Sequence, residues 1–218
     1  MRCICWAFRN RTPVSLRKQR SSCNGRCVEP KSAELLSNLG VVQSDMGEIE
    51  KARASYEKAI ALRPNSPIAL NNLGNALFKL NLPERAIQAF DRALSYKPDC
   101  LDAIYNRGNA LLFARRLDEA LATFERVIQM KPLYALAYNG RGLTCLELKR
   151  FDEAMADFDH VLRLKPDFPQ ALANRARALA EIGDIDGAFE HYGKARAIAP
   201  GSRAARPRPA VDQLWRAV

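Results

Sequence analysis

The chain has 218 residues, of which 48% are hydrophobic, and none of its apolar stretches is long enough to span a bilayer. Its net charge of +10 lies at the two ends: residues 1–32 carry eight Lys or Arg against one Glu, and residues 203–218 carry four Arg against one Asp. The part between them balances 22 basic against 22 acidic residues, which argues against a groove that follows a phosphate backbone. We therefore predict no membrane span and no specific nucleic-acid binding.

Residues 1–32 form a basic segment that lacks the pattern found further along the chain. Arg, Ser, Thr and Pro without any acid before Glu29 predict disorder or a targeting segment, and a start site assigned too far upstream would also produce it. The apolar stretch from Cys3 to Phe8 is too short for a secretory signal, so the cytoplasm is the expected location. The cysteine pairs of this segment lack the common C-x2-C spacing of zinc sites, and we predict no metal.

From residue 64 onward, five prolines stand 34 residues apart. They are Pro64, Pro98, Pro132, Pro166 and Pro200. A fixed period of this length is typical of stacked helix-turn-helix repeats. Counting each unit so that its proline falls at place 32 gives repeats 33–66, 67–100, 101–134, 135–168 and 169–202. Because proline has no N–H donor, it cannot continue the second helix of a repeat, so each repeat is predicted to end there.

Small residues recur where the two helices of each repeat should cross. The eighth place holds Gly40, Gly74, Gly108, Gly142 and Ala176, and the twentieth holds Ala52, Ala86, Ala120, Ala154 and Ala188. Aromatic residues recur at place 24, namely Tyr56, Phe90, Phe124, Phe158 and Tyr192. Glycine inside a helix costs about 1 kcal/mol relative to alanine, so we expect close helix approach to offset this cost in each repeat.

This pattern resembles the tetratricopeptide repeats, in which a small residue is eighth, alanine twentieth, an aromatic residue twenty-fourth and proline thirty-second. The resemblance covers residues 33–202 and implies an all-α fold, a right-handed α-solenoid of five repeats. The chain departs from the family at place eleven, where Gln43 and Cys145 replace tyrosine, and at place seven. There Arg107, Arg141 and Arg175 replace leucine, and we expect their stems to lie along apolar surface with their heads in water.

Catalytic chemistry is not indicated by any cluster of residues in the repeats. The two histidines, His160 and His191, are expected on second helices among ordinary surface neighbours, and Cys145 occupies a place that should be buried. The sequence has no phosphate-binding glycine loop, nucleophile elbow or metal-ligand cluster. We therefore predict a protein that is not an enzyme and uses neither a cofactor nor a metal.

Asparagine is frequent on one face of the first helix of each repeat, where places two, five, six, nine and thirteen fall together by helical spacing. The resemblance implies that this face lines the concave groove of the array. The candidate peptide-binding residues are Asn38, Asn71, Asn72, Asn75, Lys79, Asp102, Tyr105, Asn106, Asn109, Phe113, Asn139, Asn174 and Arg177. An asparagine amide offers donors and an acceptor together, which suits the backbone of an extended peptide. The alternative is that asparagine is simply a frequent surface residue in these helices.

The charges of the same face favour some ligands over others. Its acidic residues, Glu34, Asp45, Asp102, Glu147 and Glu181, outnumber Lys79 and Arg177. We therefore expect a neutral or basic peptide, with Tyr105 and Phe113 as apolar anchors near the middle. The two-carboxylate clamp of chaperone-binding relatives is matched only in part, since Asn71, Leu136 and Gly140 depart from it. Binding to the acidic C-terminus of a chaperone is not expected.

The leading hypothesis is a non-catalytic scaffold or adaptor that binds an extended peptide segment in the concave groove. Similar asparagine ladders line the repeat arm of O-linked N-acetylglucosamine transferases and related bacterial proteins. The resemblance therefore implies an alternative, the substrate-recognition arm of such a transferase whose catalytic part is absent from this chain. The sequence determines neither the identity of the partner nor the oligomeric state.

Residues 203–218 form a basic tail after the fifth repeat. Val211, Leu214, Trp215 and Val218 fall on one face of a short helix over residues 209–218, which Pro209 would open. Such a helix would cap the apolar end of the array. A frayed tail and the stub of a longer protein are the alternatives.

Overall fold

The computed structural model describes residues 30–200, and this part of the chain consists of ten helices without a β-strand. They are α2 (Pro30–Asp45), α3 (Ile49–Leu62), α4 (Pro67–Lys79), α5 (Pro83–Tyr96), α6 (Leu101–Phe113), α7 (Leu117–Met130), α8 (Ala135–Glu147), α9 (Phe151–Leu164), α10 (Pro169–Glu181) and α11 (Ile185–Ile198). Each repeat holds two helices, as predicted. The first helix begins at Pro30, before the expected start of the array at residue 33. The predicted helix over residues 209–218 lies outside the described residues.

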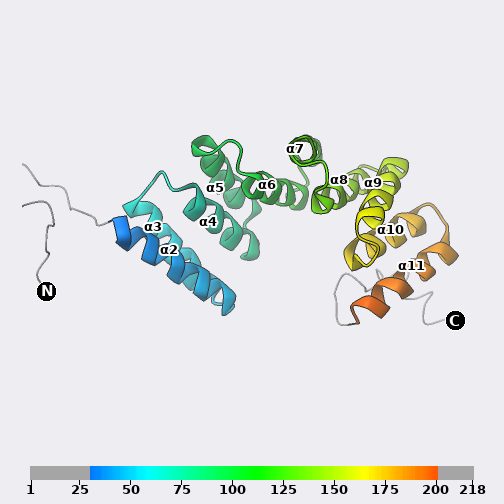
Figure 1. The fold of residues 1–218 in the computed structure, drawn as a ribbon, viewed down its shortest axis with the longest axis horizontal. Coiled ribbons are helices and arrows are strands. Elements are labelled where there is room, and N and C mark those ends of the chain that lie inside the picture. Colours follow the sequence, from blue (N-terminus) through cyan, green and yellow to red (C-terminus); the bar gives the residue numbers. More distant parts are fainter. Residues whose placement is uncertain (1–29, 201–218) are drawn as a thin grey trace, which may run out of the picture.

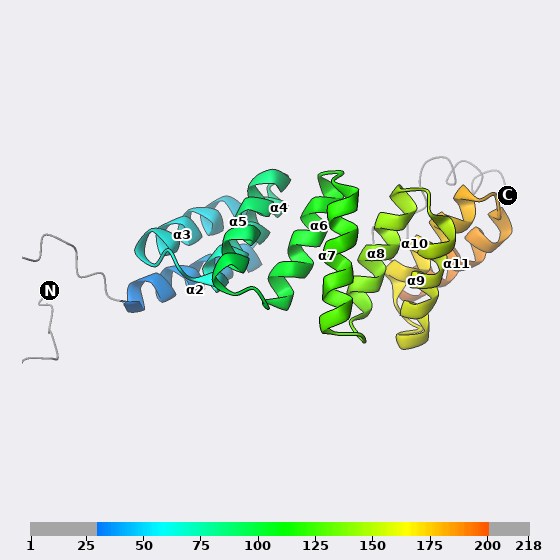
Figure 2. The same ribbon diagram turned by 90° about the horizontal axis from the view of Figure 1, so that it is seen from above.

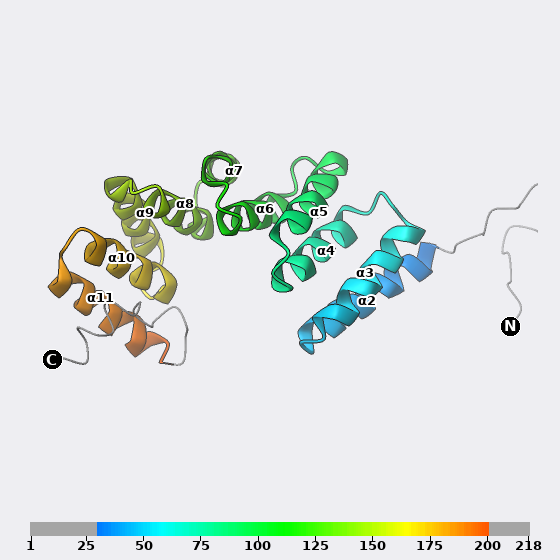
Figure 3. The same cartoon turned by 180° about the vertical axis from the view of Figure 1, so that it is seen from behind.

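The five helix pairs follow one another in chain order and form an arch (Figure 1). Seen from above, the pairs are spread along the long axis of the molecule (Figure 2). The first helices of successive repeats contact one another, from α2 against α4 to α8 against α10, as well as their own second helices. The second helices α5, α7 and α9 lie on the outer side of the arch, which the view from behind shows equally (Figure 3). The first helices therefore line the inner face.

Close packing between the two helices of a repeat depends on the glycine at the eighth place. A methyl group at Gly74 would lie 2.5 Å from Cε1 of Phe90, which is a clash. The same contact recurs at 2.6 to 2.8 Å in three other repeats, between Gly40 and Tyr56, Gly108 and Phe124, and Gly142 and Phe158. These aromatic rings are buried. The predicted crossing of the two helices at small residues is confirmed.

Each first helix is followed by a residue in the left-handed backbone region. The residues are Gly47, Asn81, Arg115, Lys149 and Gly183, all at place 15, with φ between 62° and 92°. This conformation ends the helix and turns the chain toward the second helix. Glycine and asparagine adopt it readily, whereas arginine and lysine are strained there by about 1 kcal/mol or more. Tertiary packing of the repeat therefore sets this turn even where the local sequence does not favour it.

The arginines at place seven hold acidic and polar groups of the second helices rather than extending into water. Arg107 Nε donates to Asp91 of α5 at 2.6 Å, and its Nη1 donates to Thr123 of α7 at 3.0 Å. Arg175 donates in the same way to Asp159 of α9 at 2.7 Å. The expectation that the guanidinium groups lie in water is therefore wrong. The guanidinium of Arg107 binds side chains on both helices that pack against α6, and the guanidinium of Arg175 binds a side chain on α9.

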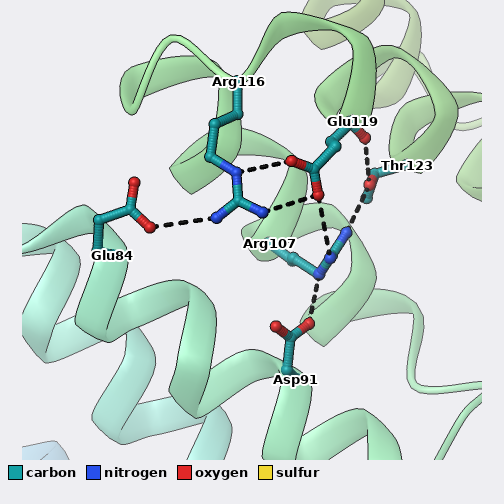
Figure 4. A network of polar contacts seen from close by, with 6 residues as sticks. All are labelled: Glu84, Asp91, Arg107, Arg116, Glu119 and Thr123. Carbon is teal, nitrogen blue, oxygen red and sulfur yellow. Dashed lines mark hydrogen bonds and ion pairs between the residues drawn. The ribbon is translucent and has the colours of Figure 1, made fainter.

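The contacts of Arg107 belong to a larger network between the second and third repeats (Figure 4). Arg116, in the turn before α7, binds Glu119 with two hydrogen bonds of 2.7 and 2.8 Å and also contacts Glu84 of α5 at 3.2 Å. Glu119 in turn lies 4.0 Å from Nη2 of Arg107. The network joins α5, α6 and α7 on their exposed side, where individual ion pairs are worth little. The network links side chains of the second repeat to side chains of the third.

Candidate functional site

A cleft of about 380 Å³ opens on the inner face between the first helices of the first three repeats. Its walls come from α2, α4 and α6, with one residue of α3 behind them. The lining residues are Val41, Ser44, Asp45, Tyr56, Asn72, Asn75, Phe78, Lys79 and Asn106. Four of the predicted binding residues, three asparagines and the lysine, therefore meet in one concavity.

Two pairs of asparagines bridge successive first helices. Nδ2 of Asn106 on α6 donates to Oδ1 of Asn71 on α4 at 3.2 Å, and Nδ2 of Asn174 on α10 donates to Oδ1 of Asn139 on α8 at 2.9 Å. All four residues are half-buried. An asparagine side chain has two N–H donors and an acceptor oxygen, so each of these bonds uses only part of the capacity of its two amides. The pairs fix the direction of each amide and leave hydrogen-bonding groups for a ligand.

The asparagine strip is interrupted in the fourth repeat for a reason of packing. A methyl group at Gly140 of α8 would lie 2.6 Å from Cε1 of Phe124 on the preceding second helix, α7. The same ring already occupies the space beside Gly108 of α6. Phe124 is fully buried between these two glycines, so a side chain at place six of this repeat would require the ring or α8 to move. Asn139 stands at place five, as Asn71 does, and pairs with the asparagine of the next repeat in the same way.

The aromatic candidates have different environments. Phe113, at the end of α6, is 55% exposed, and its ring meets that of Phe78 edge to face with centroids 5.5 Å apart. Tyr105 is half-buried and packs between Phe124 at 6.1 Å and Tyr134 at 5.6 Å. The structure therefore places Phe113 beside the cleft, next to its wall residue Phe78, and gives Tyr105 a packing role within the third repeat.

The acidic residues of the inner face divide into two groups. Glu147 of α8 lies between Arg177 of α10 and Arg115 and binds both, and Glu181 of α10 binds Lys149 at 3.0 Å. Although burial would raise it, the hydrogen bonds from the two arginines hold the pKa of Glu147 below its ordinary value. Arg177 is therefore engaged within the protein.

The carboxylates toward the N-terminal end are more accessible. Asp45 and Asp102 are exposed, and Asp45 lines the cleft together with Lys79, whose Nζ donates to Ser44 at 3.0 Å. Burial, and then the nearby carboxylate of Asp45, raise the pKa of Tyr56, so its hydroxyl stays protonated at neutral pH. Of the acidic residues expected on the inner face, Glu147 and Glu181 are thus held in ion pairs, while Asp45 and Asp102 are exposed in the first three repeats.

Two remaining candidates lie apart from the cleft. Asn38 is exposed on α2, and it lines a separate, smaller cleft of about 200 Å³ together with Glu34, Ser37 and Arg63. Asn109 is half-buried on α6, one turn beyond Asn106. The asparagines that were predicted to form one strip therefore lie in several different environments in the structure.

The cleft also contains residues that were not among the candidates, namely Val41, Ser44, Tyr56 and Phe78. Val41 stands at place nine, one of the places assigned to the inner face, so the repeat register could have identified it. Tyr56 was assigned only to the seam between helices, and it is almost fully buried behind the cleft. Phe78 stands at place twelve, outside the places assigned to the inner face. That this side of α4 lines the cleft follows only from the position of α6 beside α4.

The histidines and acidic side chains of residues 30–200 do not form a candidate metal site. Within residues 30–200, no group of three or more His, Cys, Asp or Glu side chains is arranged to hold a metal ion. His160 stacks on Tyr138 with centroids 4.1 Å apart, and Arg175 contacts His191. None of the helices over the same range is long and apolar enough to cross a membrane.

The reactivity of Cys145 tests whether the core of the fourth repeat is packed as described. Its side chain is buried, and burial raises the pKa of its thiol to about 11, above the ordinary value of 9.0. Because the thiolate is the reactive form, we expect native protein treated with iodoacetamide at about pH 7.5 to be modified at Cys100, which is half-buried, well before Cys145. Mass spectrometry of the peptides checks the order. Equal labelling of the two thiols in the folded protein would contradict the packing described here.

Comparison with protein families gives one consistent result. One family profile described as "Tetratricopeptide repeat" matches residues 105–167 and again residues 156–203. A second profile with the same description matches residues 67–100, and one described as "TPR repeat" matches residues 44–81. These matches span most of the array between residues 44 and 203. The sequence has no match among curated proteins.

Solved structures with the same fold are numerous. The chain is similar to TTC0263, a thermophilic TPR protein in Thermus thermophilus, at 26% identity and a TM-score of 0.71, over 84% of this chain and 99% of that one. It is also similar to YrrB, a TPR protein with an unusual peptide-binding site, at 25% identity and a TM-score of 0.60, over 78% and 88%.

The similarity to a third structure supports the fold and nothing beyond it. That structure is MamA from Desulfovibrio magneticus RS-1, at 24% identity and a TM-score of 0.69, over 79% of this chain and 97% of that one. The helix pairs, the glycine–aromatic contacts and the family profiles all agree. The chain therefore belongs to the tetratricopeptide-repeat family, whose members are in general protein-interaction scaffolds.

Proposed function

We propose that this protein is a non-catalytic adaptor that binds an extended peptide segment of a partner protein in the inner-face cleft between α2, α4 and α6. The observation that carries the proposal is the convergence of Asn72, Asn75 and Asn106 in one cleft, beside the amide bond from Asn106 to Asn71. Amides held in fixed directions can donate to carbonyl groups and accept from N–H groups of a peptide backbone. This mode of binding is independent of most of the peptide's side chains.

The shape of the cleft supports an elongated ligand. It extends across three successive first helices, and its far wall at Phe78 continues to the exposed ring of Phe113. An apolar side chain of the peptide would be buried against these two rings, which contributes more than the exposed polar contacts around it. The similarity to YrrB, whose description includes a peptide-binding site, is consistent with this use of the fold.

The charges of the cleft favour a neutral or basic segment. On the inner face of the first three repeats, the exposed carboxylates of Glu34, Asp45 and Asp102 outnumber the positive charge of Lys79. Further along the inner face, the carboxylate of Glu147 is neutralised by Arg115 and Arg177. A basic peptide would therefore meet its complementary charge in the first three repeats.

The proposal is tested with peptides selected from a phage-displayed random library on the full-length protein. We expect the affinity of a selected peptide, measured by calorimetry, to fall roughly 10- to 30-fold in the Asn72→Ala, Asn106→Ala double variant, because about two hydrogen bonds of about 1 kcal/mol each are lost. The matched control is Asn65→Ala, which removes an exposed amide in the turn between α3 and α4. Unchanged affinity in the double variant would exclude the cleft as the binding site.

The transferase alternative makes use of the same inner face. An arm of that kind would present substrate peptides to a catalytic chain, and its defining property would be glycosyl transfer by an enzyme that co-purifies with this protein. Full peptide binding by protein that carries no transfer activity and no second chain would favour the adaptor. The asparagine variants test the cleft in both cases.

A further inference from the structure

The first helix of the array carries an exposed apolar stripe that neither the fold nor the cleft explains. Leu35, Leu39, Val42 and Met46 are 67%, 47%, 55% and 69% exposed. The first three belong to α2, and Met46 directly follows its last residue. Their spacing of four, three and four residues places them on one side of a helix. We refer to these four residues as the α2 stripe.

Comparison with the other repeats shows what this side of the helix does. In repeats two to five, places three and ten are buried, and they hold Ala69, Ala103, Ala137 and Ala171, and Ala76, Ala110, Thr144 and Ala178. Ala137 lies in a cluster with Val127 of α7, and Ala171 lies in a cluster with Val161 of α9. These places are therefore where a first helix packs on the second helix of the preceding repeat. In the first repeat they hold Leu35 and Val42.

A further repeat of the same kind does not fit on the stripe. Helices approach closely at these places only because the residues are small, and leucine and valine would hold a second helix farther away. The opposite end of the array does not complement the stripe either. Place 28, which holds Leu94, Ile128 and Leu162 in inner repeats, holds exposed Arg196 in α11. Head-to-tail stacking of two molecules would place this arginine against an apolar surface.

We infer that the α2 stripe is a dimerisation surface that binds the same stripe of a second copy of this chain, with the two α2 helices antiparallel. The spacing of the stripe is palindromic, so an antiparallel two-fold arrangement matches every member with another. Leu35 meets Met46 of the partner subunit, and Leu39 meets Val42 of the partner subunit. A two-fold interface needs one self-complementary patch, and an uncharged stripe with this symmetry provides it.

The size of the surface determines the strength of the dimer. The stripe extends over most of a 16-residue helix, which is about 24 Å long at about 1.5 Å per residue. One helix pair of this length is at the low end of interface sizes, so we expect a reversible monomer–dimer equilibrium rather than a permanent dimer. Glu34 and Asp45 flank the stripe and stay in water.

Sedimentation velocity over a concentration series of the full-length protein tests the inference. We expect a monomer–dimer equilibrium for the wild type, and roughly tenfold or more weaker association for Leu35→Lys and for Met46→Glu measured separately. An equimolar mixture of these two variants should regain the dimer, because the positive charge on one copy then faces the negative charge on the other. Ile68→Lys is the matched control, since Ile68 is 71% exposed on α4, and it should associate as the wild type does.

Three results would overturn the inference. A wild-type monomer at every concentration would rule out the dimer and leave a different protein or residues 1–29 as candidate occupants to be tested. A dimer that Leu35→Lys leaves intact would place the interface elsewhere. Variants that dissociate separately but do not associate when mixed would exclude the antiparallel register.

Discussion

Replacing Gly140 with asparagine, which would complete the asparagine strip at place six, should destabilise the protein by about 3 kcal/mol. The new Cβ would lie 2.6 Å from both Cε1 and Cζ of Phe124, a ring that is fully buried and already touches Gly108 on its other side. Because Phe124 is fully buried, its ring or the whole of α8 must move to admit the new side chain, and overpacking of this kind is costly. Thermal unfolding followed by circular dichroism should show a decrease in Tm of roughly 10 °C.

The matched control for this substitution is Gly193→Asn in α11. Gly193 is also a helical glycine, but a Cβ at this position would have no atom within 4 Å. We expect a change of less than about 0.5 kcal/mol there, because only the helix propensity differs. Similar stabilities for the two variants would show that the gap beside Phe124 is not required for the stacking of the third and fourth repeats.

Replacing Asp157 with alanine should cost about 2 to 3 kcal/mol. Its carboxylate is buried on α9 and accepts two hydrogen bonds from Arg141 of α8, at 2.9 and 2.6 Å. The bonds to Asp157 raise the pKa of Arg141. A guanidinium is charged at neutral pH even without such a partner, so Arg141 keeps its charge when Asp157 is removed. Breaking a buried pair on one side leaves an uncompensated charge, and the 28% exposure of Arg141 reduces that cost only in part. Urea unfolding should show the loss as a lower midpoint.

The place-seven arginine of the third repeat, Arg107, provides a comparison, although its acidic partner lies on the second helix of the preceding repeat. Arg107 binds Asp91 at 2.6 Å, but Asp91 is 50% exposed and Arg107 has Thr123 as a second partner. We expect Asp91→Ala to cost less than about 1 kcal/mol. If Asp157→Ala proves equally mild, the place-seven arginines act only as surface groups, as the sequence alone indicated.

The repeat architecture was predictable because its determinants are local and recur. Proline cannot extend a helix, and glycine at a crossing point permits an aromatic ring to approach. A proline such as Pro98 and a glycine such as Gly74 therefore have the same structural effect in each repeat that contains them. The turns were less accessible to prediction. Arg115 and Lys149 adopt a left-handed conformation that their residue types disfavour, and only the helices packed around them account for it.

The candidate site was predictable as a face but not as a set of contacts. Helical periodicity placed Asn72, Asn75 and Asn106 on one side of their helices, and the structure gathers them in one cleft. The pairing of Glu147 with Arg115 links residues of adjacent repeats, which a helical face taken one repeat at a time does not show. The same offset of 32 residues joins Lys149 to Glu181, so alignment of the repeats could have revealed it.

The measurement that tests the proposed peptide site most directly is photo-cross-linking of a library-selected peptide that carries a benzophenone group, followed by mass spectrometry of the adducts. We expect adducts on α2, α4 and α6, at or next to residues that line the cleft such as Asn72 and Phe78, and competition by the unlabelled peptide. Adducts confined to the outer helices α5, α7 and α9, or to residues outside 30–200, would contradict binding in the cleft and leave the asparagines as ordinary residues of the inner face.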